Sequence, residues 1–394
     1  MDIDALRAET PRREGLIHLD NAGASLQPTP VMEEVRRHLE LEASIGGYRA
    51  IEENAAAFDN TYAALARLLN CSAGEIALIE NATRAWDMAF YSLASTMGEG
   101  DRILTAEAEY ASNFMAYLQV ARRRGVVVET VPSDADGCLD VAELENLIDG
   151  RTKLIAVTHA PTNGGLINPA ADIGRVAKAA GVPYLLDACQ SVGQTVTDVE
   201  ALGCDFLSGT GRKYLRGPRG TGFLYVRSEW IERLEPVFLD LHAATWTAPG
   251  IYEIRTDAKR FENFEKGFAA NIGLGVAVDY ALGIGMAAIE QRVASLADRL
   301  RAGLSGICGV RVCDIGREKS GICTFVIDVV APATVREKLW ARNINTSLSK
   351  SSSTLLDMTA RGLDLINRAS VHYFNTEDEI DRTVDAVAEI AAGK

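Results

Sequence analysis

Short apolar runs alternate with amphipathic helical segments between about residue 75 and residue 230. The apolar runs predict strands at 75–81, 102–108, 126–132, 153–160 and 182–188. Helical spacing of apolar residues lies between them, at 83–96, 112–125 and 170–181. Apolar strands joined by amphipathic helices are typical of a parallel sheet that is covered on both faces. We therefore predict an α/β protein with a mostly parallel sheet.

The pattern changes after about residue 255. Two helical stretches near 271–304 precede predicted strands at 310–314, 321–330 and 368–375, a helix at 333–343 and a closing helix from Thr376. We predict a large α/β domain at 50–255 and a smaller domain made of 1–49 and 256–394, α+β in its C-terminal part. Because no long linker or low-complexity tract separates them, we expect tight packing around a cleft. The span 242–267 is irregular and aromatic, and it would line that cleft or form a dimer contact.

Composition excludes several classes of function. The chain has 394 residues, of which 47% are hydrophobic and 24% charged, as in an ordinary globular protein. Its 54 acidic and 40 basic residues give a net charge of −14, which argues against nucleic-acid binding. The first fifteen residues lack the apolar core of a signal peptide, and no apolar run is long enough to span a membrane.

Cysteine and histidine usage bears on the redox state of the thiols and on metal binding. Seven cysteines, an odd number without a CxxC pair, predict reduced thiols in a cytoplasmic protein. The five histidines show no spacing typical of metal ligands, so we predict no metal site.

The stretch 208–222 holds five glycines and four basic residues. A nucleotide phosphate loop needs Ser or Thr after its lysine, whereas Lys213 is followed by Tyr214. A dinucleotide fingerprint fails as well, because Gly209 and Gly211 supply only its first half. Two interpretations remain: a glycine-rich connection with a lysine in solvent, or a turn that presents Lys213 to a site.

Asp187 favours the second interpretation, because it ends the apolar run 182–188, where open α/β sheets build their sites. A carboxylate buried there costs free energy unless it meets a cation. Asp187 and Lys213 could form a salt bridge. They could also be the fixed points of pyridoxal phosphate, whose ring nitrogen needs a carboxylate and whose aldehyde needs an amine. The segment from Asn81 to Arg84, between a strand and a helix start, would cradle its phosphate.

These residues, within segments 185–194, 205–227 and 368–381, resemble the class V aminotransferase family of fold-type I pyridoxal phosphate enzymes. That family includes the cysteine desulfurases and selenocysteine lyases. The resemblance runs from 18–30 to the last helix, and the ordered set Asp187, Gln190, Lys213 and Arg368 is its most specific part. It implies the fold-type I architecture, a large domain with a mostly parallel sheet and a smaller α+β C-terminal domain.

The resemblance also implies roles for individual residues. Lys213 would bind the cofactor covalently and move the Cα proton of the substrate. Asp187 would pair with the ring nitrogen, and Gln190 would bond the phenolic oxygen. The remaining implied cofactor contacts are the amides of Ala82 and Thr83, the hydroxyls of Thr83 and Thr210, and Arg212, which stands where desulfurases commonly have a histidine.

The implied substrate contacts are Arg368 and Gly23. Arg368 would hold the substrate carboxylate in a two-pronged pair, which suits a guanidinium. Two further positions stay open. Tyr110 would stack on the cofactor ring, unless Ala111 leaves that face uncovered. An asparagine of the family falls at either Thr162 or Asn163.

One departure from the family bears on the reaction. A desulfurase carries its persulfide-forming cysteine in a loop that here contains Ser351, Ser352 and Ser353. A serine hydroxyl cannot form a persulfide, so the sequence disfavours a desulfurase of that type.

The segments 45–50, 80–85, 161–165 and 210–225 look most like the branch of the hercynylcysteine sulfoxide lyases and other C–S lyases. We therefore predict a lyase that releases pyruvate and ammonia from a cysteine conjugate or its sulfoxide. An aminotransferase and an amino-acid epimerase or racemase are the alternatives. A non-enzymatic binding protein is disfavoured, because it would have no reason to keep Lys213. The family also implies a homodimer with active sites near the interface, to which 260–271 would contribute.

Overall fold

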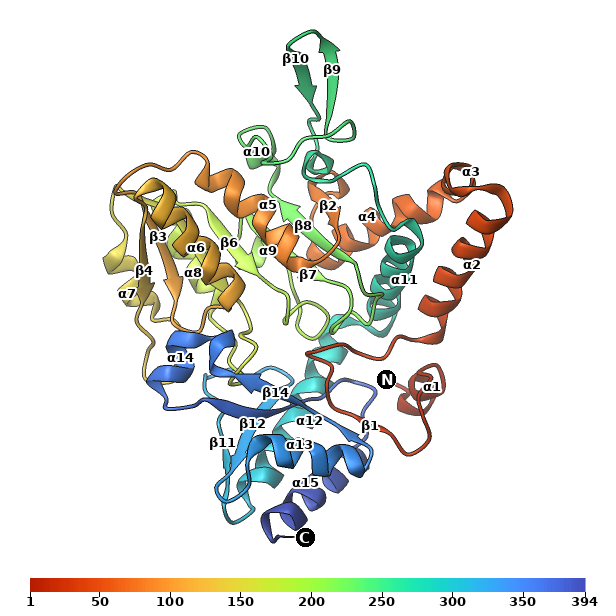
Figure 1. The fold of residues 1–394 in the computed structure, drawn as a ribbon, viewed down its shortest axis with the longest axis vertical. Coiled ribbons are helices and arrows are strands. Elements are labelled where there is room, and N and C mark those ends of the chain that lie inside the picture. Colours follow the sequence, from red (N-terminus) through yellow and green to blue (C-terminus); the bar gives the residue numbers. More distant parts are fainter. Residues whose placement is uncertain (394) are drawn as a thin grey trace.

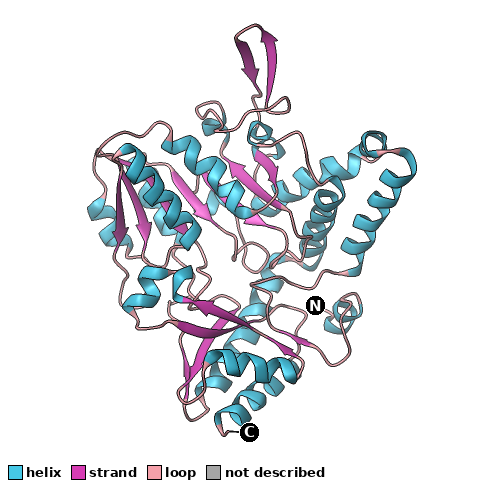
Figure 2. Ribbon diagram, viewed as in Figure 1, coloured by secondary structure: helices cyan, strands magenta, loops and turns pink. Residues whose placement is uncertain are grey.

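A seven-stranded sheet forms the centre of the larger part of the molecule (Figures 1 and 2). The computed structural model describes residues 1–393. The strands lie in the order β2-β8-β7-β6-β5-β3-β4. Neighbours from β7 to β4 pair in parallel, whereas β8 is antiparallel to β7 and β2. The bounds are β2 Ile76–Ile79, β3 Arg102–Ala106, β4 Val127–Val131, β5 Thr152–Thr158, β6 Tyr184–Asp187, β7 Phe206–Thr210 and β8 Gly222–Val226. The predicted mostly parallel sheet is confirmed.

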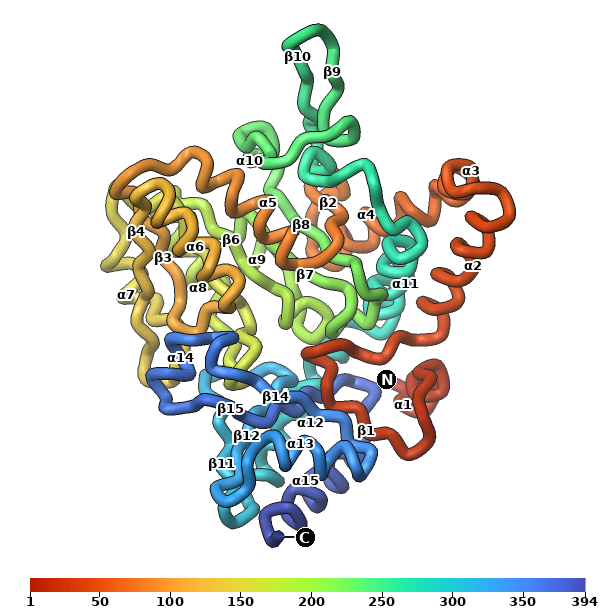
Figure 3. Tube along the Cα trace, in the orientation of Figure 1, coloured from red at the N-terminus to blue at the C-terminus, as the bar shows by residue number. Residues whose placement is uncertain are grey.

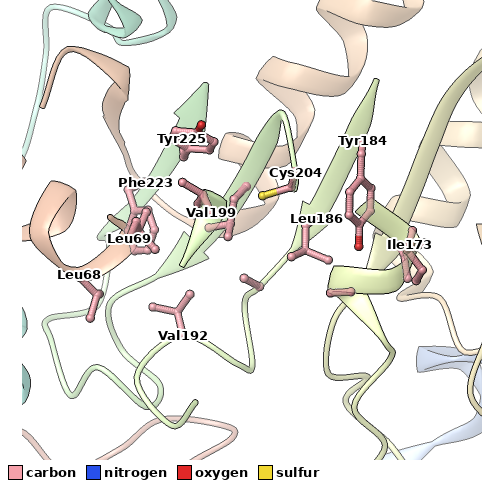
Figure 4. Packing of buried hydrophobic residues seen from close by; sticks show 14 of the residues in the cluster. Leu68, Leu69, Ile173, Tyr184, Leu186, Val192, Val199, Cys204, Phe223 and Tyr225 are labelled. Atoms are coloured by element: carbon pink, nitrogen blue, oxygen red, sulfur yellow. The ribbon is translucent and has the colours of Figure 1, made fainter. Parts of the chain in front are cut away.

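Alternate residues of each central strand belong to different cores. Leu186 of β6 packs in the core that α4 and α8 cover, and Leu185 packs in the core under α5 and α6. This alternation follows from the two-residue period of a strand, and it explains why these strands are apolar throughout. Figure 4 shows part of the first core, with Tyr184, Leu186, Phe223 and Tyr225. The helices around the sheet are α4 Ala55–Leu69, α5 Ala82–Ala94, α6 Ala111–Arg124, α7 Val141–Leu147, α8 Ala170–Ala180, α9 Val199–Leu202 and α10 Ser228–Ile231.

A four-stranded antiparallel sheet forms the centre of the C-terminal part, in the order β11-β12-β15-β14. Thr376 caps α15 with a capping box, as the predicted start of the last helix requires. The predicted strand at 368–375 lies instead at 365–370, because the chain turns between His372 and Asn375. The elements are β11 Val310–Val312, β12 Ile322–Ile327, β14 Ser347–Lys350, β15 Leu365–Ser370, α12 Met286–Ser305, α13 Pro332–Ala341, α14 Leu355–Ala360 and α15 Glu377–Ala391.

The N-terminal segment belongs to both parts. Strand β1 (Ile17–His18) pairs in parallel with β13 (Ile344–Asn345), and Asp20 bridges to Ser370. Helix α11 (Phe268–Ile284) packs against α2 (Thr29–Ile45) and α4, which Figure 3 shows at one side of the large sheet. The remaining elements are α1 Ile3–Ala8, α3 Gly47–Glu53 and the short 3-10 helices η1 Ala73–Glu75, η2 Ala258–Phe261 and η3 Ser351–Ser353. The exact domain boundaries at 50 and 255 stay a prediction.

The span 242–267 is more regular than predicted. It contains an antiparallel hairpin of β9 (Ala244–Ala248) and β10 (Ile251–Ile254), which projects from the molecule in Figure 1. The hairpin turns at Gly250, whose φ of +84° suits glycine, between strands rich in Thr, Trp, Ile and Tyr. In residues 1–393, α11 and α12 reach the length and apolar character of a membrane span only together, as a pair bent by 80°.

Candidate active site

The predicted site residues gather where the carboxyl ends of β5, β6 and β7 meet the C-terminal sheet. Arg368 of β15 donates a hydrogen bond to Thr162, which follows β5, and Gln190, which follows β6, donates to Ala22 of the N-terminal segment. Four segments of the chain are therefore joined by side chains at one edge of the large sheet. Open α/β sheets place their ligands at this edge.

Asp187 is the last residue of β6 and is 5% exposed. Its Oδ1 accepts a hydrogen bond from the Cys189 amide at 2.9 Å, and its Oδ2 accepts one from Asn113 Nδ2 at 3.0 Å. Each oxygen keeps a lone pair for another donor. The carboxylate is therefore held in one orientation and can accept a bond from a protonated ring nitrogen.

Lys213 lies in the turn between β7 and β8, as predicted from the glycine-rich stretch. Its Nζ is 3.1 Å from the Sγ of Cys189, between Asp187 and Gln190 in the sequence. Burial raises the pKa of the Cys189 thiol, although the nearby Lys213 ammonium opposes this effect. Cys189 is a site residue that sequence reasoning missed, although its position inside the Asp187–Gln190 motif was a usable signal.

Arg216 connects the Lys213 turn to the N-terminal and C-terminal segments. Its amide donates to the Lys213 carbonyl at 2.9 Å, and its buried guanidinium donates to Leu26 O, Tyr373 Oη and Thr10 Oγ1 at 2.7 Å each. The guanidinium also lies over the Phe374 ring, 4.4 Å from its centre. The backbone of Arg216 has a φ of +59°, an uncommon value for a residue with a side chain. The Lys213 turn is thus tied to both ends of the chain.

The start of α5 is open for an anion. Asn81 caps the helix by accepting from the Arg84 amide, which leaves the amides of Ala82 and Thr83 without a partner inside the helix. Thr83 is exposed, and Thr210 donates its hydroxyl to Thr221 O at 3.1 Å. A Cβ on Gly222 would lie 2.7 Å from the Asn81 backbone, so only glycine lets β8 approach this helix start.

Gln190 is in contact with Thr162, one of the two positions left open in the sequence. Gln190 Nε2 lies 3.4 Å from Thr162 Oγ1, and its Oε1 is buried without a hydrogen-bond partner. Asn163 points away and donates to Thr354 Oγ1 at 2.9 Å, beside η3. The structure therefore brings Thr162, rather than Asn163, beside Gln190 and Arg368.

Arg368 is almost buried and is held from three sides. Its Nη1 donates to Thr162 Oγ1 at 2.6 Å, its Nε to Ser347 Oγ at 3.1 Å and its Nη2 to Asp20 Oδ1 at 3.4 Å. A Cβ on Gly23 would lie 2.6 Å from the same Asp20 oxygen, so glycine makes room for this carboxylate. Asp20 is a second residue that the sequence analysis missed.

Two residues that were predicted to contact the cofactor, Arg212 and Tyr110, make contacts with other parts of the chain. The Arg212 guanidinium donates to the Gly23 carbonyl and so joins the Lys213 turn to the N-terminal segment. Tyr110 precedes α6, and its ring is partly exposed. Its amide donates to Glu109 Oε1 at 2.8 Å. Their predicted contacts with a phosphate and a ring stay predictions.

The segment where the resemblance predicts the desulfurase cysteine loop is a short 3-10 helix at the surface. Ser351 to Ser353 form η3, and Ser351 Oγ donates to Asp364 Oδ1 at 2.9 Å. Asn163 holds the following residue, Thr354. This segment contains no cysteine and so offers no thiol to a bound substrate.

These residues fit pyridoxal phosphate. The helix start suits its phosphate, the unpartnered Gln190 Oε1 suits a hydroxyl donor, and Asp187 suits a protonated ring nitrogen beside the Lys213 amine. In residues 1–393 no cluster of His, Cys, Asp or Glu could hold a metal ion. The fold and the site together define a fold-type I pyridoxal phosphate enzyme.

Comparison with known proteins identifies the family. The family model described as Aminotransferase class-V matches residues 17–383, and the chain belongs to this family. A probable hercynylcysteine sulfoxide lyase of Mycobacterium tuberculosis is 32% identical over 99% of this chain and 93% of its own. A probable cysteine desulfurase of Methanothermobacter thermautotrophicus is 28% identical over 99% of this chain and 98% of its own. The apo cysteine desulfurase from Thermococcus onnurineus NA1 has a TM-score of 0.92 and 26% identity, over 99% of this chain and 98% of its own.

Membership of the family establishes the cofactor and the general class. The protein is a pyridoxal-phosphate-dependent class-V enzyme similar to cysteine desulfurases and C–S lyases. The sequence prediction of the cofactor is therefore confirmed.

Proposed function

We propose that this enzyme is a C–S lyase that releases pyruvate and ammonia from a cysteine conjugate or its sulfoxide. The observation that supports the proposal is the serine segment Ser351–Ser353, which holds no cysteine and lies where the sequence resemblance predicts the sulfur-accepting thiol of a desulfurase. An elimination needs a base and a leaving group on Cβ, but it needs no nucleophilic cysteine.

Cys189 does not supply the missing thiolate. Its thiol is in contact with Lys213 Nζ, and burial raises its pKa, so it stays protonated at neutral pH. The thiolate, and not the thiol, is the nucleophile that accepts sulfur. Cys189 is therefore better suited to packing beside the amine than to sulfur transfer.

Arg368 and Lys213 have different roles in the proposed elimination. Pyridoxal phosphate, when bound, supplies an electron sink for the charge that develops at Cα of the amino acid. Arg368 binds the substrate carboxylate and fixes the orientation of Cα, for which the two N–H groups of its fork are suited. The Lys213 amine takes the Cα proton, and the sulfur group leaves from Cβ as a thiolate or sulfenate. The released 2-aminoacrylate takes up water and gives pyruvate and ammonia.

One relative supports the lyase proposal, although most of the similar proteins are probable cysteine desulfurases. The Mycobacterium tuberculosis relative is 32% identical over almost the whole chain, and its described activity is a sulfoxide lyase. A cysteine S-conjugate or its sulfoxide is therefore the substrate class to test first.

We also propose that the enzyme is a homodimer. Trp246, at 78% exposed, and Tyr252 present aromatic surface on the projecting β9–β10 hairpin, which a second copy of the chain would cover. The segment 260–271 lines a small cavity with Arg84 of α5, next to the proposed phosphate cradle, which supports its predicted contribution near an active site. Light scattering after size exclusion measures the oligomeric state, and a monomer would contradict this proposal.

The lyase proposal is tested with purified protein, pyridoxal phosphate and a panel of S-substituted cysteines and their sulfoxides. Pyruvate is measured through lactate dehydrogenase with no keto acid added. We expect pyruvate from at least one compound, and its loss in Lys213→Ala. The matched control is Lys178→Ala, an exposed lysine of α8, which should keep full activity.

Other products would point to the alternatives. Alanine from cysteine without pyruvate would indicate a desulfurase. Amino transfer to added keto acids, or inversion at Cα without pyruvate, would indicate an aminotransferase or an epimerase. Each of these results contradicts the lyase proposal.

A further inference from the structure

A second buried carboxylate, that of Glu109, lies close to Asp187. Glu109 stands between β3 and α6 and is 2% exposed, as is Asn113 in the first turn of α6. Asn113 Nδ2 donates to Glu109 Oε1 at 2.8 Å and to Asp187 Oδ2 at 3.0 Å. Since a carboxamide nitrogen carries two hydrogens, this one group can serve both carboxylates. The side-chain amide of Asn113 thus connects Glu109 with Asp187, the predicted partner of the ring nitrogen.

Every hydrogen-bond partner of Glu109 is a donor. Its Oε2 accepts from Thr105 Oγ1 at 3.1 Å and from the Thr158 amide at 3.0 Å. Its Oε1 accepts from the Tyr110 amide at 2.8 Å, from Asn113 and from the Thr158 hydroxyl. Such a set suits an ionised carboxylate, which can only accept. Burial, together with the charge of Asp187, raises the pKa of Glu109 to about 7.

Two neighbouring buried carboxylates need a cation. Elsewhere in residues 1–393 the buried acid Asp314 is paired with Arg301 at 2.7 Å, and Glu262 is paired with Lys266. Glu109 and Asp187 instead share a neutral amide. A protonated ring nitrogen bound at Asp187 would supply the missing positive charge.

We propose that Glu109 and Asn113 are positioning residues for the cofactor, which hold the Asp187 carboxylate and add negative charge behind it. The proposal rests on the assigned role of Asp187, but it does not depend on the reaction that follows. The Cys189 amide fixes Oδ1 and Asn113 fixes Oδ2, so the carboxylate cannot rotate away from the ring. The charge of Glu109 increases the tendency of Asp187 to keep the ring nitrogen protonated.

The test compares three variants of the full chain. Asn113→Ala removes the bridge, Glu109→Gln removes the charge, and Glu107→Gln is the matched control. Glu107 lies two residues earlier, where its carboxylate accepts from the Ser133 amide at 3.1 Å and does not contact this network. The readouts are the dissociation constant of pyridoxal phosphate from the apoprotein, the pH dependence of the absorption of the bound cofactor, and the melting temperature of the apoprotein.

We expect Asn113→Ala and Glu109→Gln to weaken pyridoxal phosphate binding by about tenfold, the cost of one hydrogen bond to a charged group. The midpoint of the spectral pH titration should shift in both variants, and Glu107→Gln should match the parent protein. Glu109→Gln places an NH₂ group among donors and is the variant at risk of misfolding. Asn113→Ala leaves the other four donors of Glu109 in place and keeps the test decisive.

An unchanged dissociation constant and spectral midpoint in Asn113→Ala would overturn the proposal. A lower melting temperature of the apoprotein without a change in cofactor binding would show a purely structural role, and would overturn it too. None of the three readouts uses pyruvate formation, so a failure here is distinct from a failure of the lyase assignment.

Discussion

The two ends of the proposed site, one for the cofactor and one for the substrate, are built differently. The cofactor end, defined by Asp187, Gln190, Lys213 and the start of α5, lies along one edge of the large sheet. The substrate end, defined by Gly23, Thr162 and Arg368, is assembled from the N-terminal segment, the connection after β5 and the C-terminal sheet.

Their interactions differ in the same way. Backbone amides and a buried amide side chain hold the Asp187 carboxylate at 2.9 and 3.0 Å. Arg368 is held by side chains of separate segments, including a long contact of 3.4 Å with Asp20. The Asp187 carboxylate is thus held within the large α/β part, by the chain after β6 and by α6, whereas Arg368 depends on how the two parts of the molecule meet. Changes at the two ends should therefore be separable.

The largest separation is expected from Arg368→Gln. Loss of two charged hydrogen bonds to the substrate carboxylate should raise KM by about a hundredfold. The cofactor spectrum should stay unchanged, because Arg368 contacts Thr162, Ser347 and Asp20 rather than the cofactor end. Steady-state kinetics and absorbance measure both effects.

A surface arginine provides the control for this change. Arg382→Gln removes a guanidinium that lies 3.8 Å from Asp378 on α15, and it should leave KM unaltered. A loss of bound cofactor in Arg368→Gln would show that the two ends are not independent.

The second prediction concerns acid and the support of the cofactor end. His159 follows β5, its amide donates to Asp187 O at 2.9 Å, and its Nδ1 lies 2.9 Å from Ser191 Oγ. Burial lowers the pKa of His159 to about 4. The unfolded chain takes up this proton near pH 6.5, so acid favours unfolding between about pH 6.5 and 4. From pH 7 to pH 5 the loss attributable to His159 is about 2 kcal/mol.

Chemical denaturation at both pH values measures this effect. His159→Asn can keep the bond to Ser191 without titrating, and the parent protein should lose about 2 kcal/mol more than this variant. The parent protein has to be compared with the variant because burial also lowers the pKa of His18 and His372, which add to the pH dependence of stability. An equal pH dependence in both proteins would contradict the assignment.

The contrast between the two ends also explains what the sequence could predict. Apolar strands and intervening helices followed from periodicity, and Asp187 and Lys213 followed from their positions next to strands of one sheet. The hairpin at 244–254 was missed because its aromatic residues were interpreted as an irregular loop. The local sequence pattern thus predicted those parts of the fold and site whose positions are set by the strands of the large sheet.

The substrate end could not be predicted to the same accuracy. The choice between Thr162 and Asn163 depends on which side chain reaches Arg368 and which reaches Thr354, both far away in the sequence. Glu109 and Asn113 are four residues apart, and two polar residues at that spacing beside a helix start were an available signal. Their contact with Asp187 depends on the packing of α6 against the sheet, which spacing cannot supply.

The smallest predicted effect tests a side chain that contacts Arg368 at the substrate end and Gln190 at the cofactor end. Thr162 Oγ1 accepts from Arg368 Nη1 at 2.6 Å and lies 3.4 Å from Gln190 Nε2. Thr162→Val keeps the shape and removes the hydroxyl, so KM should rise by about tenfold, with a two- to threefold weaker cofactor affinity, the scale of one charged and one long neutral hydrogen bond. Thr162→Ser restores the hydroxyl and should recover most of both values. A change in KM alone would mean that the hydroxyl serves only Arg368, and the two ends would then be connected through the backbone and not through this side chain.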